Sequence, residues 1–440
     1  MDTNLNFPPE FLWGTATAAH QIEGGNKNNQ WWQWEQIPGK IKNGNTSEQA
    51  CQHWDKYEQD FNLINELNNN AYRMSVEWSR VIPEPNKIDQ DALEHYHKMI
   101  DSLIKRNITP FITILHFSEP IWWNAEGSLL NKKSNHLKHF EFFVETLVKE
   151  FSEKIQFWNT INEPEILATS AYFLGNFPPG EKSLLKSIKA LNTLLILHGK
   201  TYRIIKNFQP DSKVGLVKNM VYTIPYNKKS RKDRISAKFV DYSMNGVIFR
   251  ALRTGKLYTN LLRSKKFIKR SFDFIGLNYY NFALVSQKLP DLNIVARPDT
   301  DKQFLCEGLG WEPYPDGLLF NLRRINKEFP GIPVYITENG IGTNNDNWRQ
   351  RYLIHHLMKV YQAIQEGVNV KGFFEWTLMD NFEWAEGYSS RFGLYEVDFN
   401  TQKRSKRGSA ELYSRIAKSN SISSEIIQKY LDWPIKPLNL

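Results

Sequence analysis

The chain has 440 residues, of which 41% are apolar and 23% charged, and these ordinary values exclude a disordered, collagen-like or coiled-coil protein. Its 56 basic and 47 acidic residues leave a net charge of +9, which for this length identifies no partner. Aromatic residues reach 14%, enough for some of them to line a cleft.

Short β-branched and aromatic runs alternate with longer helical patterns along the whole chain. Eight runs are predicted to be strands: residues 11–18, 71–76, 109–115, 156–161, 213–217, 272–278, 333–337 and 370–377. Between them, apolar side chains recur at the three- and four-residue spacing of helices in residues 55–68, 91–105 and 348–365.

Apolar strands that alternate with amphipathic helices predict a parallel sheet covered by helices. Eight such units fit the α/β class, as a single (β/α)8 TIM barrel spanning residues 1–440. An open, doubly wound sheet of a nucleotide enzyme is the alternative. It would favour a glycine-rich phosphate loop after the first strand, where residues 18–25 read AAHQIEGG.

The remaining composition excludes several classes of site. Cys51 and Cys306 lie far apart without metal-ligand spacing, so we expect reduced, buried thiols and no metal. The sequence lacks a signal peptide and any run of about 18 apolar residues, so we expect a cytoplasmic protein without a membrane span.

Three basic runs, at residues 228–232, 263–266 and 403–407, are interpreted as solvated loops. Binding to a polyanion or to a membrane surface is the alternative. No aromatic residues alternate with these runs as a platform for single strands requires, so nucleic-acid binding is not expected.

Polar and aromatic residues follow the predicted strands, on the side where such a barrel carries its active site. In chain order they are Gln21, His116, Asn162 and Glu163, Asn278 and Tyr280, Glu338, and Glu383 and Trp384, while Arg73 lies within the second strand. Maintenance of the fold does not require this pattern, so the rim is a candidate site.

Two glutamates at this rim, Glu163 and Glu338, each follow a β run and precede a turn residue. A pair of carboxyl groups across a pocket suits glycoside hydrolysis, in which one protonates the leaving oxygen and the other attacks or stabilises an oxocarbenium-like centre. A surface or helix-capping carboxylate is the alternative, and Asn162-Glu163-Pro164 also matches a helix start.

Sugars have apolar faces and polar edges, so a sugar site needs an aromatic floor surrounded by amide, imidazole and carboxyl groups. Side chains of this kind near the predicted strand ends are Gln21, His116, Asn162, Tyr280, Trp376, Glu383 and Trp384.

Seven segments carry a resemblance that covers nearly the whole chain. They are FLWGTATAAHQIEG at 11–24, YRMSVEWSRVIP at 72–83, LHFSEP at 115–120, TINEP at 160–164, DFIGLNYY at 273–280, ITENG at 336–340 and EWTLMDNFEWAEGYSSRFGL at 375–394. Together they resemble glycoside hydrolase family 1, the β-glucosidase family. TINEP followed by ITENG, about half a barrel later, is highly specific.

The resemblance implies a retaining β-glycosidase without a cofactor, acting on a small-molecule β-glycoside or oligosaccharide. β-D-Glucosides are the expected substrates, with β-D-galactosides or β-D-fucosides also accepted. Glu338 would be the nucleophile and Glu163 the general acid/base, while Arg73 and Tyr280 would hold and ionise Glu338.

The same resemblance assigns the sugar subsite. Its hydroxyls would be bonded by Gln21, His116, Asn162, Glu383 and Trp384, with Trp376 as the floor and Asn278 and Phe392 as further lining. In a retaining enzyme the two carboxyl groups should lie about 5–5.5 Å apart, because an inverting enzyme needs room for a water between them.

Two departures from the family pattern affect the aglycone side. Phe117 stands where many members carry Trp, and the loop at residues 222–236 is short and basic. The acidic stretch at 383–388 would repel a 6-phosphate, so an unphosphorylated sugar is expected.

Two other functions remain open. The same site could transfer the sugar to another acceptor, or the barrel could bind a glycan without cleaving it, which the presence of both carboxylates disfavours.

Overall fold

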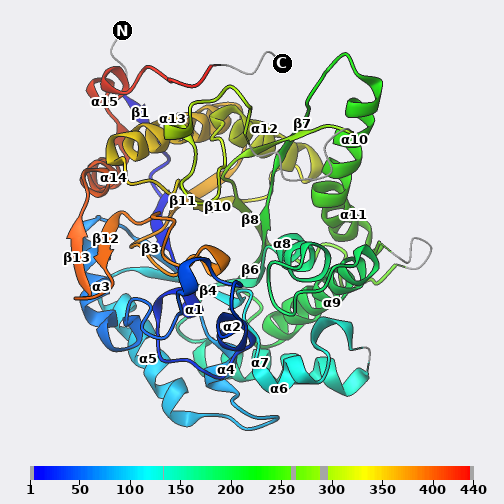
Figure 1. Ribbon diagram of the computed structural model, residues 1–440. Helices are drawn as coiled ribbons and strands as arrows, with labels where there is room; N and C mark the ends of the chain where they lie inside the picture. The colour runs from blue at the N-terminus through cyan, green and yellow to red at the C-terminus, as the bar shows by residue number, and fades with distance from the viewer. Residues whose placement is uncertain (1–3, 132, 259–263, 288–295, 437–440) are drawn as a thin grey trace.

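The computed structural model describes residues 4–131, 133–258, 264–287 and 296–436. In these residues, eight parallel strands close into a barrel in chain order, and β11 pairs with β2 to complete it (Figure 1). The strands are β2 (Leu12–Ala16), β3 (Ala71–Ser75), β4 (Thr109–Leu115), β5 (Phe157–Asn162), β6 (Lys213–Asn219), β8 (Phe274–Asn278), β10 (Val334–Asn339) and β11 (Val370–Trp376).

Helices surround the barrel and join successive strands (Figure 1). The longer ones are α3 (His53–Glu66), α5 (Gln90–Lys105), α7 (Ser134–Phe151), α9 (Leu184–Phe208), α10 (Arg231–Asp241), α11 (Val247–Thr254), α12 (Pro315–Glu328), α13 (Asp346–Gln365) and α14 (Gly408–Ser419). The shorter ones are α1 (Ala19–Ile22), α2 (Gln30–Glu35), α4 (Trp78–Val81), α6 (Ile121–Ala125), α8 (Pro164–Thr169) and α15 (Ser424–Lys429). Single turns of other helix types are η1 (Lys42–Gly44), η2 (Ser128–Leu130), η3 (Ser170–Leu174), η4 (Tyr242–Gly246), η5 (Lys302–Phe304) and η6 (Trp384–Glu386).

The predicted (β/α)8 barrel is therefore confirmed, and each of the eight predicted strands corresponds to one barrel strand. The three predicted helices correspond to α3, α5 and α13. Three short strand pairs outside the barrel were not predicted, because their two- to four-residue strands are too short to show a periodicity. They are β1 (Leu5–Asn6) with β14 (Ser421–Ile422), β7 (Tyr222–Pro225) with β9 (Phe282–Val285), and β12 (Tyr395–Asp398) with β13 (Lys403–Lys406).

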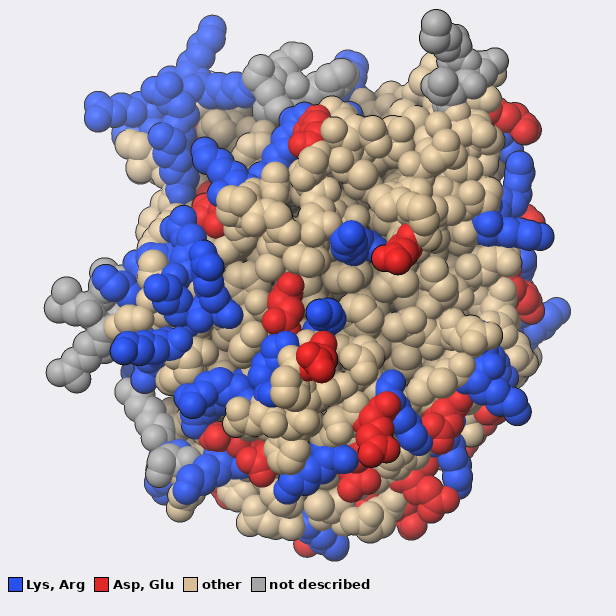
Figure 2. Space-filling view, turned by 180° about the vertical axis from the view of Figure 1, so that it is seen from behind, with Lys and Arg blue, Asp and Glu red and all other residues tan. Residues whose placement is uncertain are grey.

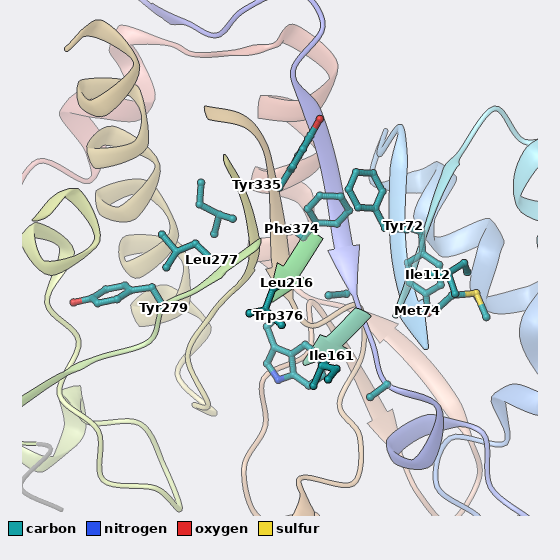
Figure 3. Close-up of a cluster of buried hydrophobic side chains, with 14 of the residues drawn as sticks. Tyr72, Met74, Ile112, Ile161, Leu216, Leu277, Tyr279, Tyr335, Phe374 and Trp376 are labelled. Carbon is teal, nitrogen blue, oxygen red and sulfur yellow. The ribbon is translucent and has the colours of Figure 1, made fainter. Parts of the chain in front are cut away.

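The interior of the barrel is filled by aromatic side chains. The ring of Phe111 stacks on that of Phe157, with centroids 4.1 Å apart, and lies 4.8 Å from Phe374. Gly215 makes room for this layer, because a Cβ atom there would lie 2.3 Å from the ring of Phe274. Figure 3 shows Phe374 and other buried side chains around the barrel strands. The filled interior leaves the carboxyl ends of the strands as the place for a site.

The basic run at 403–407 does not form a solvated loop as expected. Residues 403–406 form β13, and the guanidinium of Arg404 is buried against Asp60, with Nε 2.9 Å from Oδ1. Arg407 likewise pairs with the fully buried Asp380 at 2.8 Å. The carboxylates that neutralise these two arginines are distant in sequence, so the run itself gave no sign of them.

Two other expectations can be compared with the structure. Cys51 and Cys306 are free and buried, which confirms the prediction of reduced thiols. Among the described residues, no helix combines the length and apolar character that crossing a bilayer requires.

Candidate active site

A cavity of about 580 Å³ lies at the carboxyl ends of the barrel strands. It is lined by nine of the residues that sequence analysis selected: His116, Asn162, Glu163, Tyr280, Glu338, Trp376, Glu383, Trp384 and Phe392. Arg73, Gln21 and Asn278 are fully buried next to these residues. The twelve side chains come from different segments of the chain and meet in one place.

Glu338, near the end of β10, is held by two donors. Arg73 on β3 forms a buried ion pair with Oε1, and the Tyr280 hydroxyl donates to Oε2 at 2.6 Å. Burial, followed by the charge of Glu338, raises the pKa of Tyr280 well above its usual value, so the phenol keeps the proton that it donates. Both contacts fix the direction of the Glu338 carboxyl group.

Glu163 follows β5 directly and has a left-handed backbone, with φ of 41°. Its Oε1 accepts hydrogen bonds from Asn278 at 2.7 Å and from Asn219 at 3.1 Å. The side chain is 5% exposed and faces the cavity, although the residue directly precedes α8. The alternative of a surface or capping carboxylate is therefore wrong for Glu163.

The environment of Glu163 favours its protonated form. Burial raises its pKa well above the usual value, and the nearby charges of Glu338 and Glu165 raise it further. Glu338, in contrast, has the guanidinium of Arg73 beside it. The two carboxyl groups thus lie in different electrostatic environments.

Asn162 links the two glutamates. Its Oδ1 accepts from Arg73 at 2.7 Å and from Asn278 at 3.3 Å, so one oxygen is bonded to a neighbour of each carboxyl group. Its Nδ2 then lies 3.1 Å from His116 Nε2, which must accept.

This contact leaves the proton of the His116 ring on Nδ1. Burial, with the charge of Arg73, lowers the pKa of His116 well below its usual value, so the ring is neutral. Among the described atoms, Nδ1 has no partner although it is buried. A buried N–H without a partner in a cavity wall is available to a ligand oxygen.

Gln21 and Glu383 form a second polar group. Gln21 Nε2 donates to the Phe382 carbonyl at 2.9 Å and to Glu383 at 3.2 Å, while its buried Oε1 has no partner among the described atoms. Burial, together with the charge of Glu338, raises the pKa of Glu383 to about 8. Near neutral pH this carboxyl group is therefore able to donate as well as accept.

Aromatic rings complete the inner part of the cavity. The ring of His116 stacks with those of Trp376 and Trp384, at centroid distances of 6.2 and 6.0 Å. Phe117, the departure from the family pattern, packs edge-on against Trp384 at 5.3 Å. Flat faces beside unpaired polar atoms match the apolar face and polar edge of a sugar ring.

The structure differs from two expectations about this site. Asn278 does not line the cavity as expected; it is fully buried and donates to Glu163. Asn219, which also donates to Glu163, was missed because the predicted strand stopped at residue 217, whereas β6 continues to Asn219. The rule that polar residues gather at strand ends would have found it with the correct bounds.

The outer part of the cavity is mainly apolar. Its walls come from α8, η3, α9, α10, η4 and the segment around residue 309, and include Ile166, Phe173, Leu184, Ile188, Leu191, Phe239, Met244, Leu309 and Trp311. Among the described residues, no group of three or more His, Cys, Asp or Glu is arranged to hold a metal ion.

Comparison with known proteins gives one consistent result. The model of the family described as "Glycosyl hydrolase family 1" matches residues 3–422. A 1,4-β-D-glucan glucohydrolase of Thermotoga neapolitana is 35% identical over 446 residues, covering 95% of this chain and 99% of that protein. The chain belongs to glycosyl hydrolase family 1 and is a glycoside hydrolase.

Solved structures agree with this assignment. A family 1 β-glucosidase from Thermotoga maritima superposes with a TM-score of 0.89 at 32% identity, covering 96% of this chain and 100% of that one. A β-glycosidase from Pyrococcus horikoshii has a TM-score of 0.88 at 37% identity, covering 98% and 99%.

Proposed function

We propose that this glycoside hydrolase cleaves terminal β-D-glucosides with retention of configuration, with Glu338 as the nucleophile and Glu163 as the general acid/base. One observation carries the proposal. The two glutamates are buried in the same cavity, and hydrogen bonds through Arg73, Asn162 and Asn278 join them.

In the first step, the ionised Glu338 attacks the anomeric carbon, and the bond from this carbon to the leaving oxygen breaks. Glu163 gives its proton to that oxygen, which needs it because an alkoxide is a poor leaving group. In the second step, Glu163 takes a proton from water, and the water oxygen displaces Glu338 from the anomeric carbon.

The pKa of Glu163 follows these two tasks. While Glu338 is ionised, its charge helps to keep the proton on Glu163; once Glu338 is esterified, this charge disappears and the pKa of Glu163 falls. The acid becomes a base at the stage that requires one. For this geometry the carboxyl groups should lie about 5–5.5 Å apart.

We infer a sugar ligand from three polar groups, whose hydrogen bonds the sugar hydroxyls would complete. They are the unpaired Nδ1–H of His116, the unpaired Oε1 of Gln21 and the carboxyl group of Glu383. The proposed walls are Trp376, Trp384 and Phe392. Several relatives are named as β-glucosidases, so β-D-glucoside is the proposed substrate, with β-D-galactoside and β-D-fucoside as further ones. Comparison of the three aryl glycosides, with the product anomer identified by NMR, tests this choice.

A test of the nucleophile is the change Glu338→Ala. Turnover of an aryl β-glucoside should be lost. Added azide should restore turnover and give a glycosyl azide of inverted configuration, because the small anion fits the space that the carboxylate leaves. The exposed Glu396→Gln is the matched control and should keep normal turnover. Ordinary turnover in Glu338→Ala would disprove the assignment.

A test of the acid is the change Glu163→Gln. Substrates with poor leaving groups should lose about a hundred- to ten-thousandfold in rate, while an activated aryl leaving group should lose far less in the first step, because it needs no proton. Equal losses across a series of leaving groups would exclude Glu163 as the acid.

Product analysis distinguishes the proposed hydrolysis from two alternatives, which are transglycosylation and cleavage of 6-phosphorylated sugars. Transfer to an added alcohol or sugar, instead of to water, would be seen as new glycosides in the products. Preference for a 6-phosphorylated sugar would contradict the proposal of an unphosphorylated substrate. A cytoplasmic location stays a prediction, to be checked by cell fractionation.

A further inference from the structure

The basic run at residues 228–232 extends into helix α10, and this helix presents an apolar stripe to solvent. Ile235 and Phe239 of α10, and Tyr242 at the start of η4, follow one another at helical spacing, and their exposed fractions are 58%, 59% and 40%. The helix contacts β7 and β9 through its other side, where Asp233 and Ala237 are buried. Exposed apolar side chains in a continuous row mark a surface that contacts something apolar.

Cationic side chains flank this stripe. Those exposed in the described residues are Lys229, Arg231, Lys232, Arg234 and Lys238. In Figure 2, turned by 180° from Figure 1, Lys and Arg side chains stand out at the upper left, on the side where Figure 1 shows α10. The acidic residues of the helix do not offset them, because Asp233 is buried and Asp241 pairs with Arg324 at 2.6 Å.

The start of α9 extends the same surface. Leu184 and Leu185 are 55% and 71% exposed, and the neighbouring Lys182 and Lys189 are exposed cations. Leu184 and Phe239 both line the cavity of the active site. The exposed apolar surface therefore continues into the apolar outer part of the cavity.

An apolar stripe flanked by Lys and Arg is the pattern of a helix that lies in the interface of an anionic membrane. We propose that α10 and the start of α9 dock this protein on an anionic lipid surface, where the cavity takes β-glycosides with a lipid aglycone. The second half of this inference rests on the proposed function; the docking does not. A second copy of the chain is a poorer occupant, because a symmetric contact would bring the two sets of cations together.

Sedimentation with vesicles tests the docking. The full chain should bind vesicles of equimolar phosphatidylcholine and phosphatidylglycerol, should not bind phosphatidylcholine alone, and should be released by salt, which screens the charges. Equal binding to both vesicles, or to neither, would overturn the proposal. A dimer that forms in solution through α10, without vesicle binding, would overturn it in favour of a second copy.

Two variants locate the surface. Arg231→Glu with Lys232→Glu should weaken binding to the anionic vesicles at least about tenfold, since each basic residue near such a surface contributes about fivefold. Ile235→Ser should weaken it at the same net charge. The matched control, Lys105→Glu with Lys418→Glu, alters exposed lysines of α5 and α14, on the other side of the barrel in Figure 1, and should bind normally. If the control variant loses as much vesicle binding as the α10 variant, the electrostatic attraction does not depend on α10 and the proposal fails.

The substrate is tested with a β-glucosyl diacylglycerol in the anionic vesicles and a water-soluble aryl β-glucoside in parallel. The wild-type chain should hydrolyse both, and Arg231→Glu with Lys232→Glu should lose about tenfold on the lipid alone. If the chain hydrolyses the aryl glucoside but not the glucosyl diacylglycerol, the proposal of a lipid aglycone is wrong and the proposed function still stands. Vesicle binding without hydrolysis of either would overturn the proposed function and support the docking.

Discussion

Lys218 is a buried cation beside the active site, and the resemblance to the family did not point to it. Its Nζ donates to Glu165 at 3.0 Å, to the carbonyl of Asn219 at 2.7 Å and to that of Met244 at 2.9 Å. The side chain of Asn219 donates to Glu163. Lys218 therefore fixes the backbone that carries one partner of the proposed acid, and connects it to η4.

Removing this cation should destabilise the protein strongly. Lys218→Met leaves the carboxyl group of Glu165 buried without its partner, and we expect the free energy of unfolding to fall by about 3–5 kcal/mol. The double change Glu165→Leu with Lys218→Met removes both charges and should recover most of the loss. Urea unfolding measures both; a double variant less stable than Lys218→Met would contradict this account.

At the residue scale, the chemistry-bearing side chains were predictable and their bonds were not. Glu163, Glu338 and His116 stand directly at strand ends, which the sequence pattern locates. The neutral state of His116 depends on burial and on Arg73, and its free Nδ1 depends on Asn162. These neighbours are distant in sequence, so no local pattern contains them.

At the scale of secondary structure, β12 and β13 fasten the C-terminal part of the chain to the helices around the barrel. Asp60 on α3 accepts from Arg404 on β13 and also lies 2.8 Å from His53 Nδ1. The Arg404 and Asp60 side chains are 1% and 0% exposed, so neither charge has water to stabilise it.

The change Arg404→Met should therefore lower the free energy of unfolding by about 3–5 kcal/mol, because Asp60 keeps a buried charge without its cation. Lys403→Met, at the exposed neighbouring position, is the matched control and should change it by less than about 0.5 kcal/mol. Thermal unfolding followed by circular dichroism compares the two; equal small effects would show that the pair contributes little.

The longer elements were predictable because each carries its own periodicity. Residues 91–105 of the chain were expected to be helical, and α5 spans Gln90–Lys105. The basic run at 403–407 was misread for the opposite reason: the four residues of β13 are too few to show a period, and the carboxylates that neutralise Arg404 and Arg407 are distant in sequence.

At the scale of the whole molecule, several carboxyl groups are buried in their protonated form. Burial raises the pKa of Glu119 to about 7 and that of Glu383 to about 8, from an ordinary value of 4.5. At pH values from about 6.5 to 8, the folded chain still holds protons on these two glutamates. The unfolded chain has released them, because this range lies well above the ordinary pKa of glutamate.

The free energy of unfolding should therefore fall as the pH rises from about 6.5 through 8, since stability decreases where the folded state binds more protons. The double change Glu119→Gln with Glu383→Gln should flatten this decrease. Urea titrations across the pH range measure the slope. A rise of stability over this range, or an unchanged slope in the double variant, would contradict the assigned proton binding.

The sequence by itself determined the barrel and its pair of glutamates, because strand and helix periodicities are local and because parallel strands bring their carboxyl ends to one rim. Only the tertiary structure decided which residue bonds to which, that Asn278 supports Glu163 instead of lining the cavity, and that α10 leaves an apolar stripe exposed. Burial and charge pairing are properties of the packed molecule, since they depend on neighbours that the chain supplies from distant positions.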